Sequence, residues 1–141
     1  MLEQLASLEQ VYALCQDDPV RPHIPADQRL QPGKDVFVLR DDEANITAVI
    51  CVAYTNEVPK CEKDMSTPGL DVAVFYTVWS YNKGAGREII MQALDLVKSQ
   101  KPMVERYVTL SPLTQTATRF HQRNGAINIG IHKDCQNFEY F

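Results

Sequence analysis

Two glycines in the middle of the chain have the spacing of a phosphate-binding turn. Gly84 and Gly86 stand between an apolar run that ends near Val78 and a segment with helical periodicity. Glycine lets the backbone approach a ligand closely. The first turn of a helix offers unpaired N–H groups and the positive end of the helix dipole, and Lys83 and Arg87 would add charge on either side. The pattern predicts a pyrophosphate site, and the alternative is a tight strand-to-helix turn that simply requires glycine.

The residues around this turn do not match the common nucleotide-binding patterns. A P-loop for ATP requires Lys and then Ser or Thr directly after its second glycine, and Gly86 is followed by Arg87 and Glu88. A dinucleotide fingerprint requires a third glycine three residues after Gly86, where this chain has Ile89. Both nucleotide alternatives are therefore weaker than a phosphate site of another kind.

The elements that must position this turn follow from hydrophobic periodicity and from the placement of glycine and proline. The near-continuous apolar run from Ile46 to Tyr54 predicts a strand covered on both faces, as in a sheet with helices above and below. This pattern of elements predicts one α/β domain over residues 1–141. We expect helices at Leu2–Gln16, Ala85–Ser99 and Thr114–Arg123, a short helical turn near Ala26–Leu30, and strands at Asp35–Arg40, Ile46–Tyr54, Leu70–Val78, Tyr107–Leu110, Ile127–Ile131 and Phe138–Phe141.

Composition and charge exclude several classes of partner. The 141 residues carry a net charge of −4, without the basic excess or basic run that binds nucleic acid or anionic membrane. No apolar run approaches the ~20 residues that span a bilayer, and no signal-peptide pattern is present. The four cysteines form no C-x-x-C pair, which favours a reducing, cytoplasmic compartment. The three histidines stand far apart, so we expect no metal site.

Two motifs resemble the GNAT family of acyl-CoA-dependent N-acetyltransferases. That family carries a strand, then [QR]-x-x-G-x-[GA], then a helix, and the matching hexad here is Tyr81–Gly86, with Tyr in place of Gln or Arg. A second family pattern, N-x-x-A-x-x-[FL]-Y-x-x-x-G-F, lies on the next helix. The residues that align with it are Thr114, Ala117, Phe120, His121, Gly125 and Ala126. The two motifs occur in the family's order with one strand between them. The N-terminal third matches less well, because the chain is expected to start directly with a helix.

The resemblance implies a GNAT-like central mixed β-sheet with helices on both faces, acetyl-CoA as cofactor, and a role for each matched residue. Backbone N–H groups of the turn would bind the CoA pyrophosphate, helped by Arg87. The pantetheine arm would lie along the preceding strand, where backbone groups also polarise the thioester carbonyl. The implied cofactor-binding residues are Phe75, Tyr76, Thr77, Val78, Tyr81, Asn82, Lys83, Gly84, Ala85, Gly86, Arg87 and Thr114.

His121 is the candidate catalytic residue. It stands where the family has a tyrosine that often protonates the departing CoA thiolate. An imidazolium would serve as that acid, and a neutral imidazole would accept a proton from an attacking ammonium. A packing or surface histidine is the alternative. No general base stands out among Glu57, Glu62, Asp64 and Asp71, which lie in or beside the loop before the motif strand.

Ser111 lies in a stretch with a second resemblance. Thr109-Leu110-Ser111-Pro112 is similar to a segment of the GNAT-fold malonyl-CoA decarboxylases, in which a serine and a histidine carry out the chemistry. In the GNAT family, substrates often lie where the strand corresponding to Tyr107–Leu110 separates from the motif strand, so Ser111 would either orient a substrate or start the turn before the following helix. The sequence favours the turn role.

Three hypotheses follow. The first is direct transfer of an acetyl group from acetyl-CoA to a primary amine, in a ternary complex without a covalent intermediate. The second is a catalytically silent acyl-CoA-binding or regulatory module, since Tyr81 and His121 both depart from the family pattern. The third is a scaffold that no longer binds CoA. A small molecule or peptide would supply the amine, and the aromatic C-terminus would pack on the core or form a homodimer.

Overall fold

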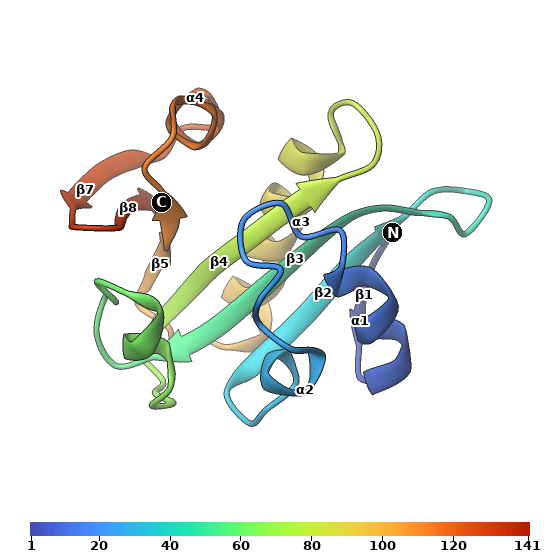
Figure 1. Ribbon diagram of the computed structural model, residues 1–141, viewed down its shortest axis with the longest axis horizontal. Helices are drawn as coiled ribbons and strands as arrows, with labels where there is room; N and C mark the ends of the chain where they lie inside the picture. Colours follow the sequence, from blue (N-terminus) through green and yellow to red (C-terminus); the bar gives the residue numbers. More distant parts are fainter.

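The computed structural model describes residues 1–141 and contains one mixed β-sheet with helices on both faces (Figure 1). The strand order is β1-β2-β3-β4-β5-β8-β6, and β7 pairs with β8. All pairs are antiparallel except β4 with β5, which are parallel. The strands are β1 (Leu2–Leu5), β2 (Lys34–Arg40), β3 (Ile46–Thr55), β4 (Val72–Ser80), β5 (Arg106–Thr109), β6 (Ser111–Pro112), β7 (Ile127–Ile131) and β8 (Cys135–Tyr140).

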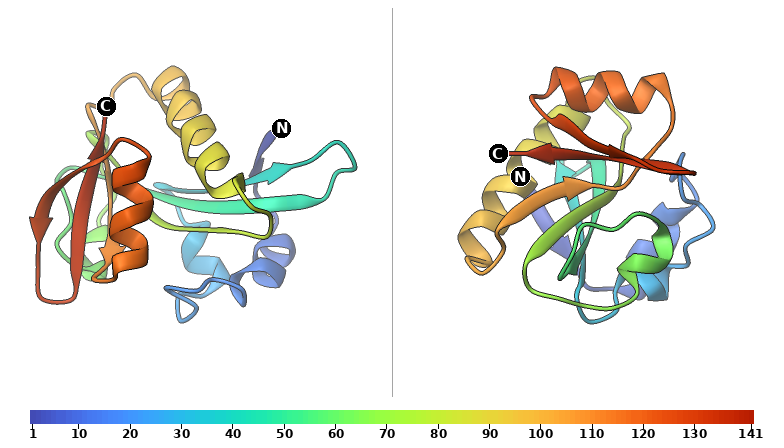
Figure 2. Two further views of the ribbon diagram at one scale, coloured as in Figure 1. Left: turned by 90° about the horizontal axis from the view of Figure 1, so that it is seen from above. Right: turned by 90° about the vertical axis from the view of Figure 1, so that its left-hand side faces the viewer.

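Two hydrophobic cores lie on opposite faces of the sheet. Helix α3 (Ala85–Gln100) covers one face, and the short helices α1 (Leu8–Cys15) and α2 (Ala26–Arg29) cover the other (Figure 2). The apolar side chains that share one side of α3, Ile90, Ala93, Leu94 and Val97, are buried. Every residue of β3 from Thr47 to Thr55 is buried too, which confirms that this strand is covered on both faces. Helix α4 (Gln115–Arg123) follows β6, and a 3-10 turn spans Glu62–Met65.

The first residues form a strand where the sequence predicted a helix. β1 pairs antiparallel with β2, and Leu5 is buried against the core. Helix α1 begins only after Ser7, whose side chain accepts a hydrogen bond from the Gln10 N–H. The helical spacing of apolar residues did continue through Leu2 and Leu5, but pairing with β2 outweighs this weak local preference. The chain therefore has a strand before its first helix, and that expected departure from the GNAT pattern was wrong.

The other boundaries differ by a few residues, and one difference affects the site. β4 continues through Trp79 and Ser80, which the sequence placed in a turn. Their backbone pairs with Val49 and Ala48 of β3, so the sheet extends to the start of the glycine turn.

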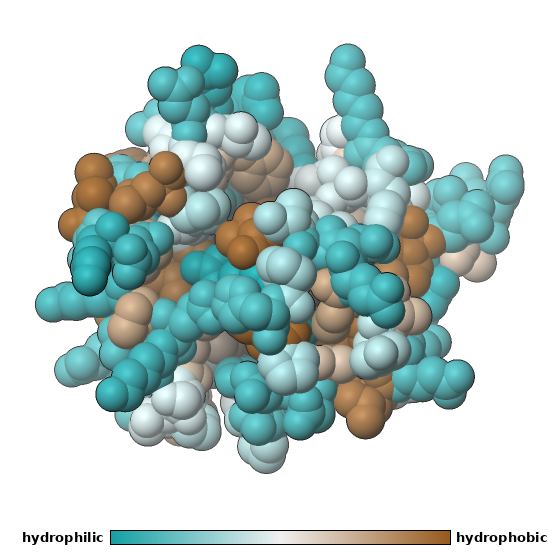
Figure 3. All heavy atoms as spheres, viewed as in Figure 1, coloured by the Kyte–Doolittle hydropathy of each residue, from teal (hydrophilic) through white to brown (hydrophobic).

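The C-terminal strand fills the core, while its neighbour β7 leaves apolar side chains exposed. Phe138 and Tyr140 are buried in the core on the α3 side. The isoleucines of β7 face outward, and apolar atoms gather at this edge of the molecule (Figure 3). None of the helices combines the length and the apolar character needed to cross a bilayer.

Candidate functional site

A cleft of about 490 Å³ opens where β4 and β5 separate. The two strands pair from Val72 with Arg106 to Phe75 with Thr109. Beyond this point β4 continues beside β3, whereas the chain after β5 turns away through β6 to α4 (Figure 1). The cleft is lined by Pro19, Val20, Phe75, Tyr76, Thr77, Val78, Trp79, Ser80, Gly86, Leu110, Ser111, Pro112, Thr114, Thr116, Ala117, Phe120 and His121.

A β-bulge lies at the start of the cleft. Cys51 pairs with Thr77 and Val52 with Phe75, so Tyr76 has no partner on β3. The carbonyl of Tyr76 instead accepts a hydrogen bond of 2.8 Å from the guanidinium of Arg21. Bulges redirect the backbone and often occur beside functional sites. Arg21 thereby stabilises the shape of β4 at the point where the strands separate.

A buried ion pair holds the segment that carries Arg21. Asp18 Oδ2 lies 2.8 Å from the Arg29 guanidinium, and both side chains are completely buried. Asp18 Oδ1 accepts hydrogen bonds from the N–H of Arg21 and from the hydroxyl of Thr77 on β4. Burial alone would raise the pKa of the Asp18 carboxyl, but the hydrogen bonds that it accepts lower this pKa below its usual value. The pair fixes Pro19 and Val20 at the edge of the cleft.

The glycine turn has the geometry that the sequence predicted. Gly84 is the N-cap of α3 with a φ of 83°, in the left-handed region that favours glycine. Five backbone N–H groups in the turn make no hydrogen bond within the chain: those of Asn82, Lys83, Gly84, Gly86 and Arg87. Unpaired donors at the N-terminus of a 16-residue helix make the local electrostatics favourable for an anion, and Gly86 lines the adjoining cleft.

Two side chains of this turn are held by other parts of the fold. The Tyr81 hydroxyl donates to Asp17 and accepts from the indole N–H of Trp79, so Tyr81 links the end of β4 to the N-terminal segment. The guanidinium of Arg87 donates to Asn124 Oδ1 at 2.8 Å, which joins the start of α3 to the end of α4. Neither Tyr81 nor Arg87 lines the cleft itself.

His121 points into the cleft from α4 and is buried. Its Nδ1 lies 2.7 Å from the hydroxyl of Tyr140 on β8. Burial lowers the pKa of His121 from 6.5 to about 4. The imidazolium form, which the sequence offered as an acid for the leaving thiolate, is therefore scarcely populated at neutral pH.

Ser111 is the cleft residue that sequence reasoning undervalued. It lies in β6, pairs with Gln136 of β8, and is buried instead of lying in a surface turn. Its hydroxyl is 2.7 Å from that of Thr109, the last residue of β5. Two sequence signals pointed to a functional role: its resemblance to a decarboxylase serine, and its place after the strand that separates from the motif strand in the GNAT family. Arg21 and Tyr140 had no such signal.

No carboxylate lines the cleft. Glu57 and Asp64 lie at a separate polar hollow of about 690 Å³ beside the β3–β4 loop. Glu62 pairs with His23, and one of its oxygens lies 3.3 Å from Arg21 Nε without hydrogen-bond geometry. Asp71 precedes β4 at the closed end, where the strands still pair. None of the four acidic candidates is placed to act in the cleft.

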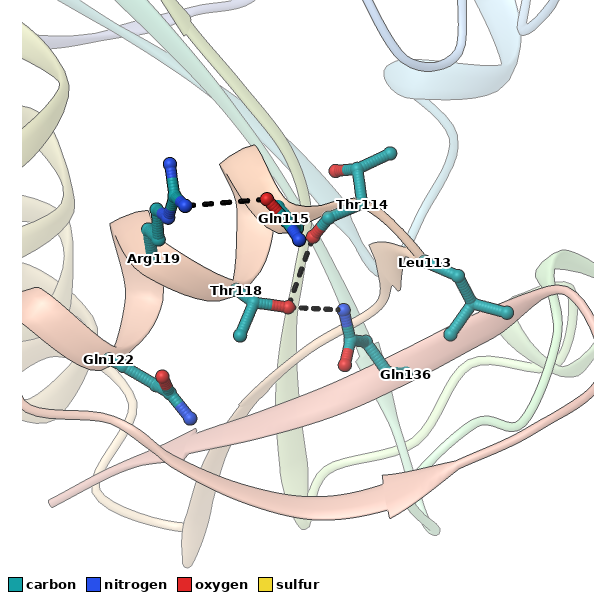
Figure 4. Close-up of a pocket in the computed structure, with 7 residues that line it drawn as sticks. All are labelled: Leu113, Thr114, Gln115, Thr118, Arg119, Gln122 and Gln136. Atoms are coloured by element: carbon teal, nitrogen blue, oxygen red, sulfur yellow. Dashed lines mark hydrogen bonds between the residues drawn. The ribbon is translucent and has the colours of Figure 1, made fainter.

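A second hollow of about 500 Å³ lies on the other side of Thr114 (Figure 4). Its wall is made of neutral amide and hydroxyl groups together with Arg119 and the apolar side chain of Leu113. The side chain of Gln136 donates to the hydroxyl of Thr118 (Figure 4). It also donates to the carbonyl of Pro112, and the two bonds tie β8 to the start of α4. Thr114 caps α4 by accepting a hydrogen bond from the Ala117 N–H, and it lines both spaces.

Comparison with known proteins supports the fold. No protein-family model matches the sequence, and no curated protein matches it. A putative GNAT-family acetyltransferase from Desulfovibrio desulfuricans matches with a TM-score of 0.69 and 12% identity, over 99% of this chain and 97% of that one. A spermidine N-acetyltransferase mutant from Vibrio cholerae matches with a TM-score of 0.66 and 13% identity, over 99% and 92%. The protein therefore has a GNAT-like fold.

A different enzyme class shares this fold. Malonyl-CoA decarboxylase from Agrobacterium vitis matches with a TM-score of 0.69 and 19% identity over 85% of this chain. This chain corresponds to only 35% of that protein's length. Because identities of this size show the fold alone, the choice between the two chemistries depends on the site.

Proposed function

We propose that this protein binds an acyl-CoA thioester in the cleft between β4 and β5 and transfers the acyl group, with acetyl-CoA as the donor and a primary amine as the acceptor. The observation that carries the proposal is the position of the glycine turn at the cleft. The free N–H groups around Gly84 suit the pyrophosphate, and Gly86 lines the cleft in which the pantetheine arm and thioester would lie. The bound CoA would thus extend from the start of α3 toward Ser111 and His121.

In this proposal the amine attacks the thioester carbon directly. The new C–N bond forms, the C–S bond breaks, and the proton lost by the amine is gained by the CoA thiolate through solvent. No carboxylate lines the cleft and His121 is a weak base, so the amine reacts in its neutral form. The net charge of −4 favours a cationic acceptor, and one structural neighbour is a spermidine N-acetyltransferase.

A panel of amines tests this proposal. Purified protein is incubated with acetyl-CoA and, in turn, spermidine, free amino acids, a peptide with a free N-terminus and a lysine peptide, and release of the CoA thiol is followed. Acetylated product and stoichiometric thiol release support the transferase. CoA binding without turnover on any amine would instead identify the silent binding module. If CoA does not bind, the result would favour the third hypothesis, a scaffold that no longer binds CoA.

Decarboxylation of malonyl-CoA is the second candidate function. The observation that favours it is that Ser111 and His121 line the same cleft, without a nearby carboxylate that would repel a malonyl group. Loss of CO2 would leave its bonding electrons on the thioester as an enolate, which takes a proton from solvent and gives acetyl-CoA. Incubation with malonyl-CoA and no amine separates the two candidates: acetyl-CoA and CO2 indicate the decarboxylase, and unchanged malonyl-CoA excludes it.

A further inference from the structure

We propose that two buried hydroxyl groups fix the direction of the hydrogen bonds in the cleft. The Tyr140 hydroxyl donates to Nδ1 of His121, which leaves Nε2–H as a donor facing the cleft. The Thr109 hydroxyl donates to Ser111, which leaves the serine O–H as a second donor. The site then presents two donors to the acyl oxygen of a bound thioester, and Tyr140 and Thr109 act as positioning residues. This inference rests on the proposed acyl-CoA site.

The direction of the first hydrogen bond follows from the surroundings of Tyr140. Its hydroxyl is buried and has no partner other than His121 Nδ1 at 2.7 Å. If Nδ1 donated to the phenol oxygen, the phenol hydrogen would be left buried without an acceptor, which is unfavourable. Burial also raises the pKa of Tyr140, so the hydroxyl keeps its hydrogen. Donation from Tyr140 to Nδ1 therefore satisfies both groups.

The other imidazole nitrogen is open to the cleft. Nε2 of His121 has no hydrogen-bond partner in the chain, and this atom is not fully buried. A neutral imidazole carries one hydrogen, and the nitrogen that bears it is set by the bond at the other nitrogen. Because Nδ1 accepts from Tyr140, the hydrogen is on Nε2. His121 is then a hydrogen-bond donor in the cleft. It does not act as the general base, which was one of the two roles that the sequence allowed.

The second hydrogen bond follows from the same reasoning. Thr109 Oγ1 already accepts from the Phe138 N–H at 3.0 Å, and Thr109 is completely buried. Its own hydrogen has one acceptor within reach, the hydroxyl oxygen of Ser111 at 2.7 Å. If Ser111 donated instead, the Thr109 hydrogen would be buried without a partner. Ser111 therefore accepts from Thr109, and its O–H is free for a ligand.

Two such donors suit an oxygen that gains negative charge. In acyl transfer, the thioester oxygen becomes the oxyanion of a tetrahedral intermediate. In decarboxylation, the same oxygen becomes that of an enolate. Donors already oriented toward such an oxygen stabilise the charge without reorganising during the reaction. The arrangement thus serves either proposed chemistry and predicts that the acyl oxygen is the recognised atom.

The hydrogen positions can be measured without any ligand. Long-range 15N–1H correlation spectra of the labelled full chain at pH 7 report which nitrogen of His121 carries the hydrogen, and His121→Gln assigns the signals. We expect a protonated Nε2 and an unprotonated, hydrogen-bonded Nδ1. Tyr140→Phe should shift the Nδ1 signal, while Tyr54→Phe, another buried hydrogen-bonded tyrosine outside the cleft, should leave it unchanged. A hydrogen on Nδ1 in the wild type would overturn the proposal.

The second experiment tests whether the donors contact the acyl oxygen. Affinities are measured for acetyl-CoA and for S-ethyl-CoA, a thioether without that oxygen. Ser111→Ala and Thr109→Val should each weaken acetyl-CoA binding about fivefold and leave S-ethyl-CoA binding unchanged. Thr109→Ser keeps the hydroxyl and should restore the affinity, and Thr47→Val, a buried threonine outside the cleft, is the control.

The outcomes separate the inference from the proposed function. Equal losses for both ligands, or no loss for either, would overturn the role of the donors while leaving a CoA site in place. If neither ligand binds the wild type, the proposed function fails, and with it the role of the donors toward a thioester. The hydrogen on His121 is still decided by the spectra, because that measurement needs no ligand.

Discussion

At the scale of single residues, the site depends on polar groups that the fold buries and pairs. Asp18 and Arg29 form an ion pair in the buried interior, where an unpaired charge is costly. His121 is buried with only Tyr140 as a partner and stays neutral. These buried groups position the segments that line the cleft. Removing one of them should therefore lower the stability of the protein more than removing a charged group at the surface.

Asp18→Asn is predicted to destabilise the protein by about 3–5 kcal/mol, because it leaves Arg29 buried without its counter-charge. Urea unfolding followed by circular dichroism measures this change. The matched control is Glu3→Gln, which removes the partner of Arg40 in an exposed pair and should cost less than about 1 kcal/mol. Equal, small losses for both variants would show that the buried pair does not hold the N-terminal segment.

The stability of the protein should fall as the pH drops from about 6.5 to about 4. The unfolded chain takes up a proton at His121 in this window and the folded chain does not, since burial lowers the pKa of His121 from 6.5 to about 4. The unfolded state binds more protons, so folding weakens toward acid, by about 3 kcal/mol over the window. Urea unfolding at a series of pH values should show this slope in the wild type and a flatter profile in His121→Gln. If both proteins show the same slope, the loss of stability between about pH 6.5 and about pH 4 comes from another titratable group.

Asp18 should contribute a separate acid transition. Because its pKa is lowered in the folded state, its contribution is complete above the unfolded value near 3.9 and is lost as the pH falls through the folded value. The His121 window lies above this range, so the two effects can be resolved on one stability profile. In Asp18→Asn the loss below about pH 4 should be smaller than in the wild type.

At the scale of elements, the strand-turn-helix unit from β4 to α3 was predictable because its signals are local. Two glycines, an apolar run before them and a helical stripe after them need no knowledge of the rest of the chain. The N-terminal strand was not predictable, because Leu2 and Leu5 fit a helix equally well and only pairing with β2 decides. The bulge at Tyr76 was also hidden, since it depends on Arg21, 55 residues away in the sequence.

Gly84→Val should weaken CoA binding by distorting the turn. A Cβ at this position meets no atom within 4 Å, so the cost arises from the φ of 83°, about 1–2 kcal/mol for a residue with a Cβ. Asn tolerates this region better, so Gly84→Asn should bind CoA more tightly than Gly84→Val. Calorimetric titration with CoA and thermal unfolding of both variants check the prediction. Unchanged CoA affinity in Gly84→Val would remove the turn from the binding site.

At the scale of the whole molecule, the fold admits more than one chemistry. The match covers 97% and 92% of the two GNAT acetyltransferases but only 35% of the decarboxylase. The two motifs in order were sufficient to predict this fold. The residues that would separate the two chemistries were harder to foresee, because Thr109, Ser111, His121 and Tyr140 meet only when β5, β6, α4 and β8 assemble.

The central claim is that the cleft between β4 and β5 binds acyl-CoA, and the most direct test is thermal unfolding with ligand. Acetyl-CoA at about 100 times its dissociation constant should add about 2.7 kcal/mol of stability and raise the melting temperature, while ATP and NAD should not. Ala117→Trp, which would fill the cleft from α4, should abolish the shift. No shift with acetyl-CoA, or an equal shift with ATP or NAD, would contradict the account and reduce the glycine turn to a structural feature of the fold.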